Sequence, residues 1–336
     1  MRSSLEELLA TGRVLLADGA TGTNYFAAGL EAGEPPEFWN EQHPDRVAAL
    51  HQAFVDAGSD IVLTNTFGCN PHRLKLHGAQ DRAREIAATA ARIARGVADA
   101  ADRPVVVAGS VGPTGELFVP MGALTHEAAV ESFGVQIAGL REGGADVVWI
   151  ETMSSAEEVH AAATAATEAG MPWVATCSFD TAGRTMMGIL PSQLPTIVAA
   201  EPVAPLAIGA NCGVGAPDIL VSVLEMSSSA VPVVCKGNCG VPQFVGTEIV
   251  YSGTPELMAR YAVLAADAGA RIVGGCCGTT PTHLAAMRAA LDARTPGERP
   301  ALERIIADVG PLTNSLPGVA GHGGERRGRR SRPGDE

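Results

Sequence analysis

The strongest constraint on the fold is an alternation of short apolar runs with Ala-rich amphipathic stretches, which occurs eight times along the chain. Short, continuous, β-branched runs of this kind are typical of strands that are buried on both faces. The predicted strands are 14–17, 61–64, 105–108, 147–150, 173–177, 206–209, 232–235 and 272–274. The predicted helices lie near 44–57, 81–101, 126–142, 156–169, 192–200, 216–226, 255–268 and 281–292.

Eight strand-then-helix units predict an α/β chain with a (β/α)₈ TIM barrel, a single domain over residues 1–295. An open doubly wound sheet is the alternative, but its usual phosphate-binding patterns, G-x-G-x-x-G and G-x-x-x-x-G-K-[ST], are missing from the expected places. Residues 296–336 form a C-terminal extension. We expect disorder from about residue 316, where arginines cluster among few apolar residues. A contact of this segment with RNA or an acidic partner is the other interpretation.

Composition limits the partners and the location of the protein. A formal net charge of −13 argues against nucleic acid and anionic membranes as partners of the folded part. No stretch approaches the roughly 20 apolar residues of a membrane span, and Glu6 and Glu7 stand where a secretory signal would be apolar. We therefore expect a cytoplasmic protein with small-molecule substrates, and a homo-oligomer is compatible with the sequence. Cysteines there stay reduced and serve as ligands or nucleophiles rather than in disulfides.

Chemically distinctive residues follow several predicted strands at the point where each strand ends. In a barrel all strand ends of this kind face one mouth, where active sites are built. The residues concerned are Asp18 and Gly19 after the first strand, Glu151 at the end of the fourth, Cys212 after the sixth, Asn238 after the seventh, and Cys276 and Cys277 after the eighth. Asn65 and Phe67 follow the second strand in the same way. The sequence therefore predicts three thiols, two carboxylates and two amides at the mouth.

Cys212, Cys276 and Cys277 are the predicted ligands of a zinc ion. Soft sulfur ligands select Zn²⁺, and three protein ligands leave the fourth position open, as in catalytic sites. With three anionic thiolates, such a zinc suits activation of a further thiol better than hydrolysis, which indicates thiol alkylation. A purely structural zinc, closed by Asn238 or Cys239, is the alternative. Inert burial is the expectation for the remaining cysteines, Cys69, Cys177, Cys235 and Cys239.

A thiol-bearing amino acid also needs contacts for its ammonium and carboxylate groups. Asp18 and Glu151 are the predicted partners of the ammonium. The backbone N–H groups of the turn formed by Gly19, Ala20 and Thr21 are the predicted partners of the carboxylate. For Asp18 alone, an ordinary turn-forming role before glycine is the alternative.

The sequence resembles the homocysteine S-methyltransferase family. The resemblance runs from about residue 12 to 293 and rests on DGATGTN at 18–24, NTFGCN at 65–70, GSVGPTGE at 109–116, ET at 151–152, GANCG at 209–213 and GGCCGTTP at 274–281. It implies a zinc-dependent barrel that methylates homocysteine to methionine, with the three cysteines as zinc ligands and the two carboxylates on the homocysteine ammonium. It also implies that Asn238 supplies an amide to the fourth zinc position when homocysteine is absent.

The methyl donor implied by the resemblance is glycine betaine, which would leave as dimethylglycine. The length, the segment EPPEFWNEQHPD and the stretch CSFDTAGRTMMG resemble stand-alone bacterial betaine–homocysteine methyltransferases. Aromatic faces normally surround a quaternary ammonium, and Trp39 is the residue predicted to offer such a face to the donor. Packing of Trp39 within its own loop is the alternative. One alternative donor is S-methylmethionine. The other is a methylcorrinoid or methyl-folate that a separate partner presents to a homocysteine-binding module.

Overall fold

The computed structural model describes residues 2–240, 242–245 and 248–314. Eight parallel strands form one sheet in the order β1-β10-β7-β6-β5-β4-β3-β2. A parallel bridge between Ala17 and Ile61 joins its two edges and closes the barrel. The strands are β1 (Leu15–Leu16), β2 (Ile61–Leu63), β3 (Val106–Val111), β4 (Val147–Met153), β5 (Trp173–Cys177), β6 (Ala207–Cys212), β7 (Val233–Gly237) and β10 (Ala270–Gly275). The predicted TIM barrel is confirmed, and each predicted strand matches one of these within a few residues.

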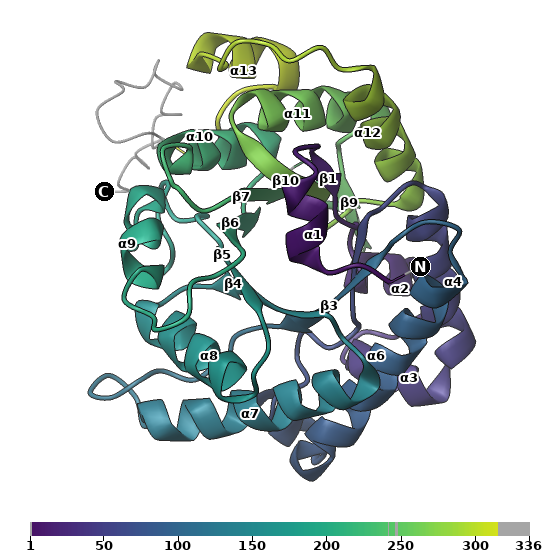
Figure 1. Cartoon of the computed structure of the whole chain (residues 1–336), viewed down its shortest axis with the longest axis vertical. Helices are drawn as coiled ribbons and strands as arrows, with labels where there is room; N and C mark the ends of the chain where they lie inside the picture. Colours follow the sequence, from purple (N-terminus) through teal and green to yellow (C-terminus); the bar gives the residue numbers. More distant parts are fainter. Residues whose placement is uncertain (1, 241, 246–247, 315–336) are drawn as a thin grey trace, which may run out of the picture.

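Helices surround the barrel, as the ring of ribbons in Figure 1 shows. The α-helices are α1 (Leu5–Ala10), α2 (Gly22–Ala27), α3 (Trp39–Gln42), α4 (Pro44–Asp56), α5 (Pro71–Leu74), α6 (Ala83–Ala100), α7 (His126–Gly143), α8 (Ala156–Glu168), α9 (Leu194–Val198), α10 (Ala216–Met226), α11 (Pro255–Asp267), α12 (Pro281–Ala293) and α13 (Leu302–Val309). Short 3₁₀ turns are η1 (Pro36–Phe38), η2 (Lys75–His77), η3 (Gln80–Arg82) and η4 (Pro191–Gln193). A hairpin of β8 (Pro242–Val245) and β9 (Glu248–Tyr251) follows β7.

Small residues let the outer helices approach one another closely. A Cβ atom at Gly139 of α7 would lie 2.2 Å from the backbone oxygen of Arg84, and one at Gly143 would lie 2.4 Å from that of Ala88, both in α6. The alanines of α6 form the opposing surface, and ten residues of that helix are buried. The low aromatic and high alanine content of the sequence therefore follows from close helix packing.

The barrel interior is a second apolar core, separate from the layer between strands and helices. Leu5 and Leu8 of α1 pack with inward-facing strand residues such as Ile61, Trp149 and Val234. Helix α1 therefore covers the end of the barrel at which the strands begin, and Figure 1 shows it over the barrel centre. The opposite end, where the strands terminate, is left for the functional site.

The chain beyond the barrel begins with a packed helix. Ile305 of α13 is fully buried, and α13 contacts α10 and α11. The arginine-rich segment for which we predicted disorder lies outside the described residues. Within the described part of the chain, no helix combines the length and the apolarity needed to cross a membrane.

His51 of α4 should make stability depend on pH. Its ring is buried, neither ring nitrogen has a hydrogen-bond partner among the described residues, and burial lowers its pKa to about 4. The unfolded chain takes up a proton near pH 6.5 and the folded chain does not. We therefore expect the free energy of unfolding to fall by about 3 kcal/mol as the pH drops from 6.5 to 4.

Urea unfolding across that pH range measures this loss. His51→Leu should flatten the pH dependence, whereas the exposed His126→Gln should leave it unchanged. An equally steep loss of stability in the His51 variant would show that other groups titrate instead.

Candidate functional site

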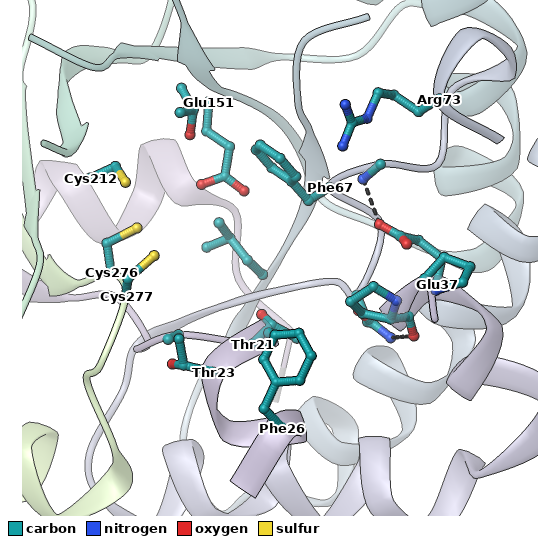
Figure 2. A pocket seen from close by; sticks show the side chains of 18 of the residues that line it. Thr21, Thr23, Phe26, Glu37, Phe67, Arg73, Glu151, Cys212, Cys276 and Cys277 are labelled. Carbon is teal, nitrogen blue, oxygen red and sulfur yellow. Dashed lines mark hydrogen bonds between the residues drawn. The ribbon is translucent and has the colours of Figure 1, made fainter. Parts of the chain in front are cut away.

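A cavity of about 670 Å³ opens at the end of the barrel where the strands terminate. Its deep part is lined by Cys212, Cys276, Cys277, Glu151 and Lys236, and its outer part by the segments after β1 and β2. Figure 2 shows the three sulfurs on one side, the Glu151 carboxylate in the centre and Phe67, Arg73 and Glu37 on the other side. The cavity therefore has a sulfur-rich floor and an aromatic, charged outer half.

The three predicted metal ligands lie together. Their sulfur atoms lie within 4.8 Å of one another, and all three side chains are partly exposed to the cavity. The hydrogen bond with Cys212, followed by burial among neighbouring thiols, raises the pKa of Cys276 above its usual range. Three soft sulfurs that share one open side fit a metal ion with a fourth position free.

The backbone has an unusual conformation at Cys212 and at the residue that follows Glu151. Cys212 at the end of β6 has φ of 63°, and Thr152, directly after Glu151, has φ of 62°. Residues other than glycine rarely adopt this conformation, and it is found where function requires it. Asn211 holds the Thr152 turn, because its Oδ1 accepts from the Thr152 N–H at 2.8 Å and its Nδ2 donates to Oγ1 at 2.7 Å.

Asn238 links two of the loops that carry the cysteines. Its Nδ2 donates to the backbone oxygen of Gly213 at 2.6 Å, and its Oδ1 accepts from the backbone N–H of Cys277 at 3.0 Å. Asn238 does not line the cavity, and its amide holds these loops beside the Cys212 thiol. Its contact with the substrate or the metal stays a prediction. Cys239 lies outside the thiol cluster, with its Sγ 3.3 Å from the backbone oxygen of Gly253.

The two predicted carboxylates occupy different positions. Glu151 lines the cavity; one of its oxygens accepts from the Ser110 hydroxyl, and the other has no partner among the described residues. Burial raises its pKa. Asp18 lies behind the cavity wall, where its Oδ2 accepts from the Leu63 N–H at 2.6 Å and its Oδ1 lies 2.7 Å from Lys236 Nζ. The structure therefore brings Glu151, and not Asp18, to the cavity surface.

The turn that we predicted for carboxylate binding lines the cavity but is partly occupied. The backbone N–H of Ala20 donates to the oxygen of Thr279 at 3.2 Å. A Cβ atom at Gly19 would lie 2.6 Å from the same oxygen, so glycine is needed for this close approach. Gly19, Ala20 and Thr21 thus connect the first strand to the loop that carries Cys276 and Cys277, and the Ala20 N–H is not free for a ligand.

Trp39 is not part of the cavity, which corrects its predicted role. It is 1% exposed and packs against Tyr25 and His43, with ring centroids 5.3 and 5.0 Å away. Segment 18–43 folds into α2, η1 and α3, and Trp39 fills the space between these short helices and the barrel helices. The phenyl rings that line the cavity belong to Phe26 and Phe67. The structure agrees with the alternative interpretation, in which Trp39 packs within its own segment.

Sequence analysis missed Lys236, Ser110 and Tyr251. Lys236 directly follows the apolar run 232–235, in the motif KGNCG. A lysine at the end of a buried strand indicates a functional position, and this signal was present in the sequence. Ser110 supports Glu151 from the next strand. Tyr251 interacts with the Cys277 thiol, and its ring lies where a Cβ at Gly278 would be, which explains that glycine.

Comparison with known proteins agrees with this geometry. A model of the family described as homocysteine S-methyltransferase matches residues 15–291. The chain belongs to this family. Its sequence is 34% identical over 299 residues to the methionine synthase of Mycobacterium tuberculosis, which covers 83% of this chain and 25% of the relative. It is 32% identical over 338 residues to the methionine synthase of Mycobacterium leprae, with coverage of 94% and 27%. The chain thus spans about a quarter of the length of these relatives.

Solved structures share the fold. The metallated form of the homocysteine methyltransferase MmuM from Escherichia coli superimposes with a TM-score of 0.72 at 23% identity, covering 85% of this chain and 99% of that one. Its oxidised form gives a TM-score of 0.68 at 23% identity, with coverage of 82% and 95%. The chain described here thus has the barrel fold of these structures, with its thiol cluster in the cavity at the strand ends.

Proposed function

We propose that the protein transfers a methyl group to the sulfur of homocysteine, giving methionine, and that Cys212, Cys276 and Cys277 hold a zinc ion for this purpose. The observation that supports it is the set of three sulfurs within 4.8 Å of one another, open to a cavity that also presents a carboxylate. Bound zinc would lower the pKa of the acceptor thiol and keep it as a reactive thiolate.

The side chains of the cavity align the reactants. The free oxygen of Glu151 is suited to the homocysteine ammonium, and the Ser110 hydroxyl fixes the orientation of that carboxylate. In the reaction the acceptor thiol gives its proton to solvent, and its sulfur then attacks the donor methyl carbon. The S–CH₃ bond forms as the bond to the donor nitrogen breaks, and the nitrogen keeps the electron pair of that bond. A cationic donor leaves as a neutral amine and needs no acid, so alignment accounts for most of the catalysis.

Glycine betaine is the donor that we propose. Phe26 and Phe67 line the outer half of the cavity and offer aromatic faces to a trimethylammonium group. Arg73 lines the same half, and no carboxylate lies within ion-pair distance of it among the described residues, so it can receive the donor carboxylate. S-methylmethionine carries the same combination of a methylated cation and a carboxylate and is the closest rival.

A second candidate is a homocysteine-binding part whose methyl group comes from another domain or protein. The observation in its favour is the fourfold greater length of the methionine synthases that the chain resembles. In this case a methylcorrinoid or methyl-folate would be brought to the cavity mouth by a partner. We assign residues 1–295 to the homocysteine-binding barrel in either case.

The cytoplasm is the location that we propose, because three reduced thiols require a reducing compartment. Small molecules are the proposed partners.

The decisive experiment measures methionine formation from homocysteine by the zinc-loaded protein, with glycine betaine, S-methylmethionine and methyltetrahydrofolate offered separately. We expect turnover with betaine, and Phe67→Ala should then raise the KM for betaine more than that for homocysteine. Turnover with S-methylmethionine alone would show that S-methylmethionine, and not glycine betaine, is the donor. Homocysteine binding without turnover of any donor would favour the second candidate, and no homocysteine binding would refute the proposal.

A further inference from the structure

We propose that the Glu37 carboxylate is the counter-charge for the positive end of the methyl donor, which makes the donor a methylated onium compound, a quaternary ammonium or a sulfonium. This inference rests on the proposed function and names the chemical class of its second substrate. Glu37 lines the cavity on the side opposite the three sulfurs, together with Phe67 and Arg73, as Figure 2 shows. It therefore lies in the outer half, away from the proposed acceptor.

Hydrogen bonds fix the segment that carries Glu37 against the loop after β2. The amide of Asn40 donates to the backbone oxygens of Glu37 and Asn65 at 2.8 and 2.9 Å, and the Asn65 amide donates to that of Pro36 at 2.7 Å. The backbone N–H of Gly68 donates to Oε1 of Glu37 at 2.6 Å, the bond that ends on the carboxylate in Figure 2. The carboxylate is therefore held in place before any ligand binds.

Glu37 is a buried carboxylate that has no cation of its own. Its exposed fraction is 5%, and Oε2 has no hydrogen-bond partner among the described residues. The basic residues Lys75 and Arg82, from the segment after β2, pair with Glu116 and Glu41 instead. An unpaired carboxylate is costly to bury, and burial accordingly raises the pKa of Glu37. A cation bound in the cavity would supply the missing charge.

The surroundings of Glu37 suit a methylated cation better than an ammonium group. An ammonium needs several acceptors, whereas a methylated onium group has no N–H to donate and requires only a negative charge and an aromatic face. Oε2 of Glu37 offers the charge, and Phe67, the residue before Gly68, offers a ring in the same cavity. Arg73 lies on this side as well, so a zwitterion can place its cation at Glu37 and its carboxylate at Arg73.

A purely structural role for Glu37 is the competing explanation, and Glu37→Gln separates the two. A Cβ atom at Gly68 would lie 2.9 Å from Oε1, so the side chain packs tightly on this loop. Glutamine keeps the length of the side chain and an acceptor for the Gly68 N–H, and it removes only the charge. A structural role would therefore leave the variant unchanged toward all ligands, whereas the proposed role predicts a loss confined to cations.

Calorimetric titration of the zinc-loaded protein with three small ligands tests the assignment. The ligands are glycine betaine, choline, which has the same cation without the carboxylate, and 3,3-dimethylbutanoate, the carbon isostere of betaine without the positive charge. For Glu37→Gln we expect affinity for betaine and choline to fall at least about tenfold, because a charge attraction in a largely dry site is lost. Affinity for 3,3-dimethylbutanoate should not fall.

Two further variants provide the reverse pattern and the control. Arg73→Gln should weaken betaine and 3,3-dimethylbutanoate and retain choline. Glu34→Gln removes a half-buried carboxylate of the same cavity, where water screens the charge, and should change each affinity less than about threefold. In the unmodified protein, betaine should bind at least about tenfold more tightly than 3,3-dimethylbutanoate, a comparison that needs no variant.

Steady-state kinetics give a second measurement. Methyl transfer turns the onium group into a neutral amine or thioether, so Glu37 stabilises the bound donor more than the transition state. Glu37→Gln should therefore raise the KM for the donor that turns over, betaine or S-methylmethionine, at least about tenfold without lowering kcat.

Equal weakening of all three ligands, unchanged affinity for both cations, or an equally large effect of Glu34→Gln would overturn the assignment. Turnover of an onium donor with an unchanged KM in Glu37→Gln would overturn it as well and leave the proposed function standing. Cation binding that depends on Glu37 in a protein that methylates no homocysteine would support the assignment and refute the proposed function.

Discussion

Cys276→Ala should abolish zinc binding and methyl transfer together. The three sulfurs lie within 4.8 Å of one another, and the substitution leaves two ligands, too few for a stable site. Loss of an outer-shell partner costs about 10- to 100-fold in metal affinity, so loss of a direct ligand should cost more than about 100-fold. Metal analysis after dialysis and a methionine-formation assay measure the two effects in the same preparation.

Cys177→Ala is the matched control for this prediction. Cys177 ends β5 and is fully buried in the apolar layer, outside the thiol cluster. Its removal should lower stability through lost packing and leave both zinc content and activity near their original values. Methyl transfer that persisted in zinc-free Cys276→Ala would contradict activation of the acceptor sulfur by the metal.

Glu151→Gln should reduce homocysteine affinity about 100-fold while zinc remains bound. The substitution keeps the shape of the side chain and the contact with Ser110 but removes the carboxylate that lines the cavity together with the three cysteines. Loss of one partner from a buried charge pair costs about 2–5 kcal/mol, and roughly 3 kcal/mol corresponds to this factor. The measurement is homocysteine titration by calorimetry, with zinc content determined on the same sample.

Ser110→Ala separates the charge of Glu151 from its orientation. This variant keeps the carboxylate and removes only the hydroxyl that holds it. We expect a smaller loss of homocysteine affinity, about tenfold, in line with one hydrogen bond to a charged group. A Ser110 variant as defective as Glu151→Gln would mean that orientation, and not charge, accounts for the contribution of Glu151.

The regular alternation of apolar runs with amphipathic stretches made much of the fold predictable from the sequence. The eight apolar runs are long enough, and separated widely enough, that only parallel strands with intervening helices satisfy them. The helix over 302–309 was missed because it lies after the last barrel unit, where no repeat supports it. Its burial depends on the surfaces of α10 and α11, which the local sequence does not reveal.

The sequence by itself determined which residues reach the mouth of the barrel, because a strand end fixes the position of the next residue in any parallel barrel. The three cysteines were placed together on that ground alone. Only the tertiary structure decided where the neighbouring side chains point and what they contact. It directed Trp39 into packing, used both amide atoms of Asn238 to join loops, and paired Asp18 with Lys236 across more than 200 residues of chain. Such contacts depend on side-chain direction and on partners distant in sequence, and no local pattern of residues contains that information.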